Sequence, residues 1–189
     1  LWEGGTVVVP AFGIGRTQEL LMVCAAYDID CYVDGMGVEV LDMLREHPAF
    51  LRDADALDRA ARHARTVTGR DGQRKRIAAG NTVIVTTSGM LSGGPAMTYI
   101  PEIRTDPTNR ISLTGYQVEG TPGRQLLETG RCGLNVGVRP VAPKPPFFVF
   151  FVTPAPIGLR PFFLPYEEPP FPVNTAVPFG DFAAELVPE

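Results

Sequence analysis

Residues that could hold an anion gather between Ser88 and Gly94, where two hydroxyls and three glycines occur within seven residues. An apolar run precedes this turn and a helix-like run follows it. Backbone N–H groups and hydroxyls in such a turn can form a nest for a phosphate group. A loop that needs positive φ at its glycines has the same composition, so both interpretations stay open. The candidate phosphate-binding residues here are Ser88, Gly89, Ser92, Gly93 and Gly94.

A second turn of this kind follows the apolar run 7–10, and its candidate phosphate contacts are Gly13, Gly15 and Arg16. The guanidinium of Arg16 could grip a phosphate through two parallel hydrogen bonds. An ion pair between Arg16 and either Glu19 or Glu3 explains an arginine at this position equally well.

The same turn raises an alternative function, that of a nicotinamide-dependent oxidoreductase with a dinucleotide-binding site. Gly13 and Gly15 begin a dinucleotide fingerprint, and Asp34 follows the next strand, where a ribose-binding acid is expected. Gln18, however, stands where the fingerprint requires its third glycine. The fingerprint is therefore truncated.

A third turn follows the run 111–115, and its candidate RNA or phosphate contacts are Tyr116, Gly120, Thr121 and Arg124. Tyr116 could stack on a nucleobase. A core tyrosine with its hydroxyl at the surface is the more common arrangement for such a residue.

Three repeats of apolar run, glycine turn and helix-like segment, at 7–21, 83–100 and 111–127, predict βα units. A further strand is expected at 31–33, and helices at 17–27, after Gly37 until Pro48, and after a cap at Asp53 or Asp55. The predicted fold class is therefore α/β, a Rossmann-like parallel sheet with flanking helices. Because parallel strands end at one edge of a sheet, the turns should share that edge and receive an anionic ligand.

Between the first and second units the chain carries a basic segment, with seven basic residues against a single acidic one. A helix with arginines three residues apart would align the first three on one stripe. A solvated face is the simpler interpretation, and a surface that tracks phosphates is the functional one. The residues of this accessory patch are Arg59, Arg62, Arg65, Arg70, Arg74, Lys75 and Arg76.

Composition divides the chain into a domain at 1–131 and a tail at 132–189. From Pro140 onward lie thirteen of the nineteen prolines and nine of the eleven phenylalanines, which excludes regular sheet or helix. We expect this tail to be irregular or partly disordered. The formal charge of -4 excludes a basic field over the whole surface, and three scattered cysteines fit a reducing, cytoplasmic setting. No run is long enough to cross a membrane. The domain begins within a strand-turn pattern, so we expect a fragment.

Four linked segments resemble the β-CASP domain of RNA-processing metallo-β-lactamase-fold nucleases. They are GGTVVVPAFGIGRTQELL, VDGMG, VIVTTSGMLSGGPAMTYI and ISLTGYQVEGTPGRQLL, and they occur in the family's order over residues 3–131. The nearest likeness is to the archaeal enzymes similar to the cleavage and polyadenylation specificity factor nuclease, with ribonuclease J more distant.

The resemblance implies a cap that clamps single-stranded RNA over a two-zinc site, in RNA processing, mRNA 3′-end processing or decay. The family's zinc ligands come from a metallo-β-lactamase domain, which is missing from this chain. The only histidines, His47 and His63, lie on separate helical segments and are not expected to bind metal. We therefore expect no cofactor in this chain, two zinc ions in a full-length member, and no catalytic residue here. A degenerate structural protein, which could form a homodimer, is the remaining alternative.

Overall fold

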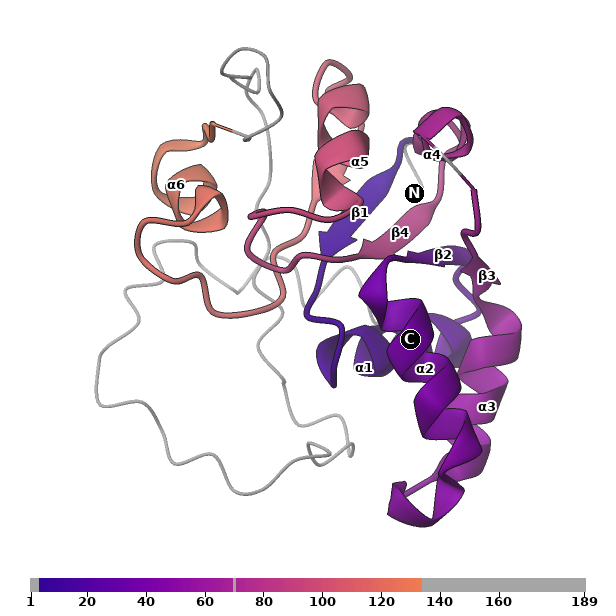
Figure 1. Ribbon diagram of the computed structural model, residues 1–189. Coiled ribbons are helices and arrows are strands. Elements are labelled where there is room, and N and C mark those ends of the chain that lie inside the picture. Colours follow the sequence, from indigo (N-terminus) through magenta and orange to yellow (C-terminus); the bar gives the residue numbers. More distant parts are fainter. Residues whose placement is uncertain (1–3, 70, 134–189) are drawn as a thin grey trace, which may run out of the picture.

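The fold is a parallel β-sheet with helices on both faces (Figure 1). The computed structural model describes residues 4–69 and 71–133. Within these residues, five parallel strands lie in the order β3-β2-β4-β1-β5. The strands are β1 (Val7–Pro10), β2 (Cys31–Asp34), β3 (Arg65–Thr66), β4 (Val83–Thr86) and β5 (Arg110–Ile111). The α/β architecture predicted from the repeated strand-turn-helix pattern is confirmed.

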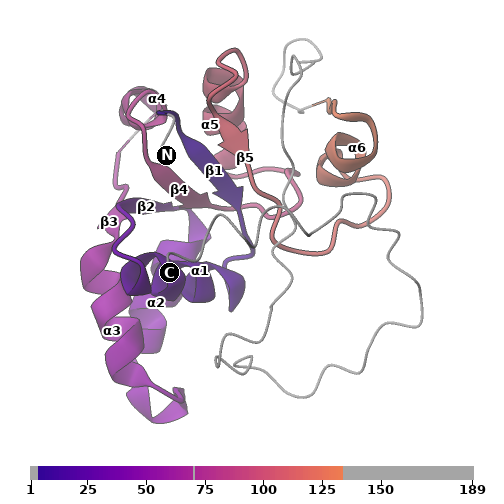
Figure 2. The same cartoon turned by 180° about the vertical axis from the view of Figure 1, so that it is seen from behind.

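The helices form a layer on each side of the sheet. Figure 1 shows α1, α2 and α3 on one face, with α4 and α5 on the other, and Figure 2 shows the same layers from behind. Helix α6 follows the last strand and lies beyond α5. The helices are α1 (Arg16–Ala26), α2 (Met36–Glu46), α3 (Ala54–His63), α4 (Asp71–Ala78), α5 (Ala96–Ile103) and α6 (Pro122–Thr129), with a 3-10 turn η1 (Pro48–Phe50) after α2.

The sheet is buried on both faces because neighbouring residues of its central strands point to opposite layers. Val8 and Ile84 pack with residues of α4 and α5, including Ile77 and Tyr99. The adjacent residues Val9, Val83 and Val85 pack in a second cluster with α1 and α3. The β-branched runs therefore form strands that need apolar partners on both sides, as their composition predicts.

Helix boundaries follow the local signals closely. The carboxylate of Asp53, one of the two predicted caps, accepts a hydrogen bond from the backbone N–H of Ala56 at 2.8 Å, so α3 starts at Ala54. Helix α2 ends at Glu46, shortly before Pro48, as the proline predicts.

One helical prediction is wrong. Helix α3 ends at His63, and Arg65 lies in strand β3, where it pairs with Tyr32 of β2. Arg65 therefore does not continue the stripe of Arg59 and Arg62. A three-residue spacing places side chains on one stripe only while the helix lasts, and here it ends two residues too early.

The predicted boundary between domain and tail, at residues 131 and 132, lies beside the last described residue. Cys132, which the composition assigns to the tail, is buried in the core cluster that contains Leu113 and Leu126. The rest of the predicted tail, from residue 134 onward, lies outside the described residues. Among the residues that are described, no helix is both long and apolar enough to span a bilayer.

Candidate functional site

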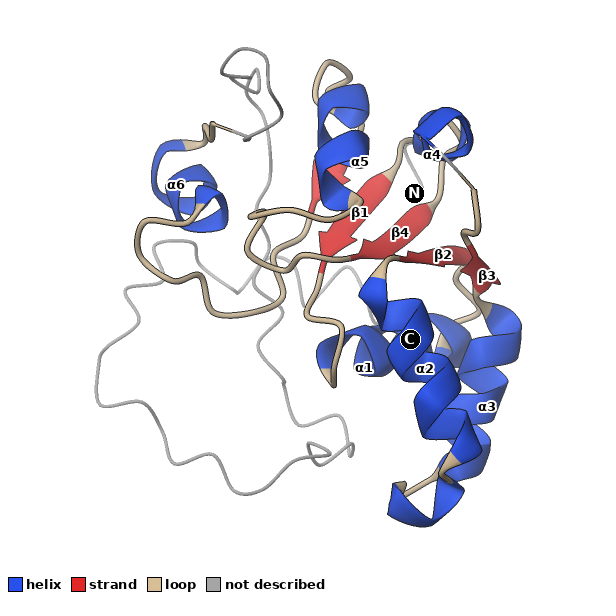
Figure 3. Cartoon of the chain, in the orientation of Figure 1, coloured by secondary structure: helices blue, strands red, loops and turns tan. Residues whose placement is uncertain are grey.

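The glycine turns meet at the carboxyl edge of the sheet. Pro10 of β1 and Asp34 of β2 both pair with Thr86 of β4, so these three strands end at the same level. In Figure 3 the loops that follow β1 and β4 leave the sheet on the same side. The third turn joins them because the backbone N–H of Gly123 donates to the carbonyl of Met90 at 2.9 Å. We call residues 12–16, 35–37, 88–94 and 115–124 the glycine rim.

Several glycines of the rim are required by contacts between the turns themselves. A Cβ on Gly89 would lie 3.1 Å from the backbone of Ala11 and Phe12. Gly94 has φ +72°, and a Cβ there would lie 2.6 Å from the carbonyl oxygen of Thr87. A Cβ on Gly123 would collide with the side chain of Gln117. Gly94 therefore has the positive φ that the structural interpretation of the second turn requires, whereas Gly89 and Gly123 are required by close approach of neighbouring groups.

The first turn is closed by the side chain of Gln18, which is 5% exposed. Its carboxamide oxygen accepts the N–H of Gly15 at 2.7 Å, and its amide nitrogen donates to the carbonyl of Gly13 at 3.0 Å. The N–H of Arg16 donates to the carbonyl of Ile14. Two amides at the start of α1 are thus satisfied within the protein. The residue that stands in place of the third glycine of a dinucleotide fingerprint therefore binds the backbone of the turn itself.

Arg16 projects from the start of α1 and pairs with Glu19, with 2.7 Å between Nη1 and the carboxylate. This is one of the two ion pairs expected for it. Both side chains remain about one-third exposed, so the pair is screened by water and can rearrange toward a stronger anion.

The second turn keeps donors available. The hydroxyl of Ser88 accepts the N–H of Ser92 at 3.0 Å, and the N–H of Ser88 donates to the carbonyl of Gly93. These bonds close the loop on itself. The N–H groups of Gly93 and Gly94 make no hydrogen bond to any part of the chain that the structure describes. Gly94 is exposed and Gly93 is half-buried, so both amides lie near the surface of the rim.

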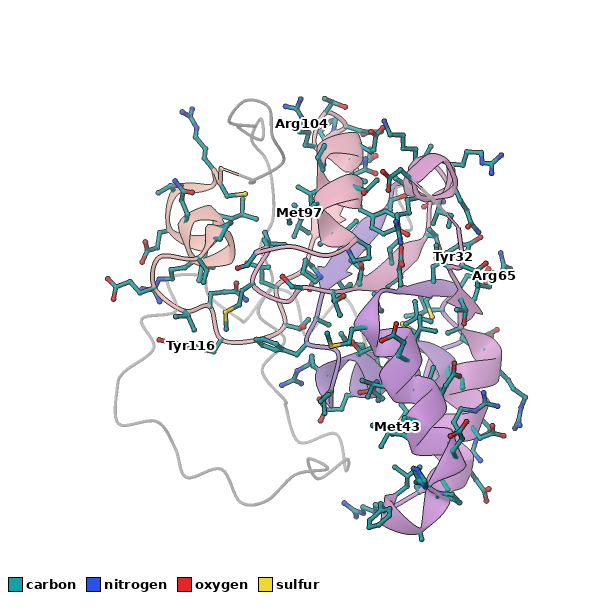
Figure 4. The ribbon with its side chains drawn as sticks, in the orientation of Figure 1. Tyr32, Met43, Arg65, Met97, Arg104 and Tyr116 are labelled. Atoms are coloured by element: carbon teal, nitrogen blue, oxygen red, sulfur yellow. The ribbon has the colours of Figure 1, made fainter. Side chains whose placement is uncertain are left out.

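The third turn combines a helix cap with exposed side chains. Thr121 caps α6 by accepting the N–H of Arg124 at 3.3 Å, and the guanidinium of Arg124 pairs with Glu128 at 2.5 Å. Gly120, with φ +80°, precedes this cap. Tyr116 is 72% exposed, so the interpretation of Tyr116 as a core tyrosine is wrong. Figure 4 labels it on the loop between β5 and α6.

A second glutamine holds the third turn against the second. Gln117 is 1% exposed, and its amide nitrogen donates to the carbonyls of Gly89 and Gly115, each at 3.0 Å. Sequence reasoning did not assign a role to Gln117 or Gln18. A glutamine three residues after the glycine that caps α1 can accept the N–H of that glycine, as the Glu or Gln of a capping box does, and this spacing identifies Gln18. Nothing local distinguishes Gln117 from a surface residue.

Asp34 is part of a buried ion pair and is not directed at an open turn. It is 2% exposed, and Arg74 donates to both of its carboxylate oxygens, at 2.7 and 3.1 Å. The hydroxyl of Tyr99 also donates to it, at 2.7 Å. The hydrogen bond to Asp34 raises the pKa of Arg74, and burial together with Asp34 raises that of Tyr99. Asp34 therefore joins β2 to α4 and α5, which disfavours its role as a ribose-binding acid.

The basic segment does not form one continuous patch. Arg59 and Arg62 lie on α3, on the opposite face of the sheet from α4, which carries Arg74, Lys75 and Arg76 (Figure 1). Arg70 lies outside the described residues. The segment appears continuous in the sequence because one crossover leads from one face of the sheet to the other.

Most of its charges are also paired. Arg62 pairs with Asp58, Arg65 with Asp30 at 3.4 Å, and Lys75 with Glu102 at 3.0 Å. Within the described residues, Arg59 and Arg76 make no ion pair. The positive field expected from the sequence is therefore largely neutralised.

The described residues do not fit a zinc centre. Among them, no three side chains of His, Cys, Asp or Glu lie close enough together to hold a metal ion. The ring of His63 is hydrogen-bonded through Nε2 to the carbonyl of Ile29 at 2.8 Å, and His47 lies exposed beside Phe50. No chemical step is therefore assigned to a metal on this chain.

Sequence comparison agrees with the fold. The profile of the Beta-Casp domain matches residues 17–126, more than half of the chain, so the chain belongs to this family. The match includes the second and third glycine turns and both glutamines of the rim.

Individual relatives come from archaea. The chain is 35% identical over 136 residues to the probable RNase MJ4 of Methanocaldococcus jannaschii, covering 69% of this chain and 32% of that protein. It is 39% identical over 131 residues to RNase aCSPSF2 of Saccharolobus solfataricus, covering 68% and 26%. It is 31% identical over 142 residues to the transcription termination factor FttA of Methanothermobacter thermautotrophicus, covering 67% and 22%. The chain thus spans a third or less of each relative's length.

Proposed function

We propose that this chain is the RNA-binding cap of a zinc-dependent metallo-β-lactamase/β-CASP ribonuclease that acts in RNA processing, in mRNA 3′-end processing or in decay. Membership of the Beta-Casp family and the kinship with archaeal proteins named as RNases support it. The observation that carries the proposal is the position of the three glycine turns, which lie at one edge of the sheet and contact one another.

The chemistry of the rim suits the backbone of a single strand. The amides of Gly93 and Gly94 and the hydroxyls of Ser88 and Ser92 can donate to phosphate oxygens or to ribose. Arg16 and Arg124 stand at the starts of α1 and α6, where helix N-termini add positive potential. Tyr116 offers an exposed aromatic face on which a base can stack. None of these groups reads a base edge in a fixed geometry, so binding should tolerate any sequence.

We further propose that hydrolysis requires a metallo-β-lactamase domain outside these 189 residues. The described residues provide no ligand set for zinc, and the relatives are at least three times longer than the segment they share with this chain. The purified chain should therefore bind RNA without cutting it.

Filter binding of a short, labelled single-stranded RNA tests the proposal. Raising the salt from about 50 to about 200 mM should weaken binding at least tenfold, because phosphate contacts release counterions. Replacing Arg16 and Arg124 together by Gln should weaken binding further and flatten the salt dependence. Arg59→Gln, which removes the same charge from α3, is the control and should have little effect. Absence of binding at low salt, or stoichiometric zinc in the purified chain, would overturn the proposal.

A second candidate is an interaction module. Phe12, Ile14 and Met36 lie at the rim and are 42%, 63% and 59% exposed. Exposed apolar side chains gathered at one site can mark a contact with protein. If this surface forms a homodimer, the mass measured by light scattering should double as the protein concentration rises. The Ile14→Lys variant should keep the mass of a monomer at the same concentrations.

A further inference from the structure

A hollow of about 310 Å³ lies away from the glycine rim, between strand β2 and helix α4. It lies on the face of the sheet that α4 and α5 cover. None of the candidate residues of the three turns lines it. The lining residues are Tyr32, Gln73, Arg76, Ile77, Gly80 and Thr82.

Tyr32, one of the lining residues, has a guanidinium beside its aromatic ring. Tyr32 is half-buried, and the guanidinium carbon of Arg65 lies 5.7 Å from the centre of its ring. Arg65 also donates to the Tyr32 hydroxyl at 3.4 Å and to Asp30 at 3.4 Å. Figure 4 shows the two labelled side chains beside each other at β2 and β3. A planar group can stack on the ring of Tyr32 and also interact with the guanidinium of Arg65.

The wall of the hollow carries a charge without a counterion. Arg76 is exposed and has no ion pair within the described residues, whereas its neighbours Arg74 and Lys75 both bind carboxylates. The amide of Gln73, also without a hydrogen bond to the described residues, lies one helical turn before it. The carboxylate of Asp30 is engaged by Arg65. Arg76 therefore gives the hollow an unpaired positive charge, and the side chains of Gln73 and Arg76 are available to a ligand, whereas the hydroxyl of Thr82 donates to the carbonyl of Asp30.

We propose that this hollow binds one nucleotide of single-stranded RNA, with the base on the Tyr32–Arg65 pair and the phosphate on Arg76. A volume of about 310 Å³ is at the lower end of those found for ligand sites, which suits a single nucleotide. The choice of RNA as the source of the nucleotide rests on the proposed function, but the site is spatially separate from the rim. Two residues of the basic segment, Arg65 and Arg76, would then serve binding.

Calorimetric titration of the full chain with adenosine monophosphate tests this inference. We expect saturable binding of one molecule per chain, at least fivefold weaker in Arg76→Gln and unchanged in Arg59→Gln. Adenosine should bind more weakly than the monophosphate and should not respond to Arg76→Gln. Tyr32→Leu should also weaken binding of the monophosphate, and a melting curve for each variant confirms that it is folded.

Three results would overturn the inference: no saturable binding of adenosine monophosphate, equal loss in Arg59→Gln and Arg76→Gln, or inorganic phosphate binding as tightly as the nucleotide. The third result would show that the hollow binds an anion without recognising the nucleoside. The double replacement of Arg16 and Arg124 by Gln separates this inference from the proposed function. It should weaken RNA binding at the rim and leave the monophosphate titration unchanged.

Discussion

The first and second glycine turns look alike in the sequence and are closed by different groups. In the first, the carboxamide of Gln18 takes the N–H of Gly15 and the carbonyl of Gly13, while the N–H groups of Gly13 and Ile14 make no hydrogen bond to the described residues. In the second, the loop closes through Ser88 and Ser92 while the amides of Gly93 and Gly94 stay without a partner in the described residues. The comparison teaches that only those amides of a glycine-rich turn that no nearby group satisfies can form a phosphate nest.

The largest effect should come from Gly94→Ala in the second turn. Its φ of +72° and the approach of 2.6 Å to the Thr87 carbonyl leave no room for a methyl group. We expect a loss of roughly 2–4 kcal/mol in the free energy of unfolding, measured by urea denaturation. Gly93→Ala is the matched control, because a Cβ at Gly93 meets nothing within 4 Å. Equal loss in both variants would show that the loop does not hold the described conformation.

In the first turn, Gln18→Ala should destabilise the fold by about 2 kcal/mol, since it removes two hydrogen bonds to the half-buried backbone of Gly15 and Gly13. Gln18→Met keeps much of the volume without the hydrogen bonds and should lose a similar amount. The RNA affinity of the folded fraction should stay near that of the unmodified chain. If Gln18→Met were as stable as the unmodified chain, packing would explain the role of Gln18.

Ser88→Ala should produce the smallest change in stability, about 1 kcal/mol, because it removes one acceptor from the Ser92 N–H. Its RNA affinity should nevertheless fall about three- to tenfold, the equivalent of one hydrogen bond. Measuring the RNA affinity of Ser88→Ala and of Gln18→Met by filter binding under the same conditions compares the two turns directly. An affinity loss that is larger in the first-turn variant than in Ser88→Ala would reverse the assignment of the two turns.

Much of the fold could be predicted from the sequence because its signals are local. The β-branched runs form the strands, Asp53 caps α3 as proposed, and Pro48 follows the end of α2. The shared edge of the turns also follows, since parallel strands must end together. The exposure of Tyr116 could not be predicted, because a tyrosine after a strand packs inward or outward according to the next helix.

The two buried glutamines mark the limit of this reasoning within the rim. Its spacing from Gly15 reveals Gln18, since Gln18 lies within one helical turn of the amide it satisfies. Gln117 acts on Gly89, 28 residues away, and no pattern near it indicates that contact.

The sequence by itself determined the central strands, most of the helices, the family and the edge at which a ligand would approach, because these depend on periodicity and on turn chemistry between near neighbours. It did not reveal β3 or α4. Only the tertiary structure decided which amides remain available and which charges are cancelled. Asp34 and Arg74 are 40 residues apart in the chain, and Lys75 meets Glu102 only after both helices pack on the same face. Hydrogen bonds and ion pairs act over a few ångströms, so their partners are fixed by folding.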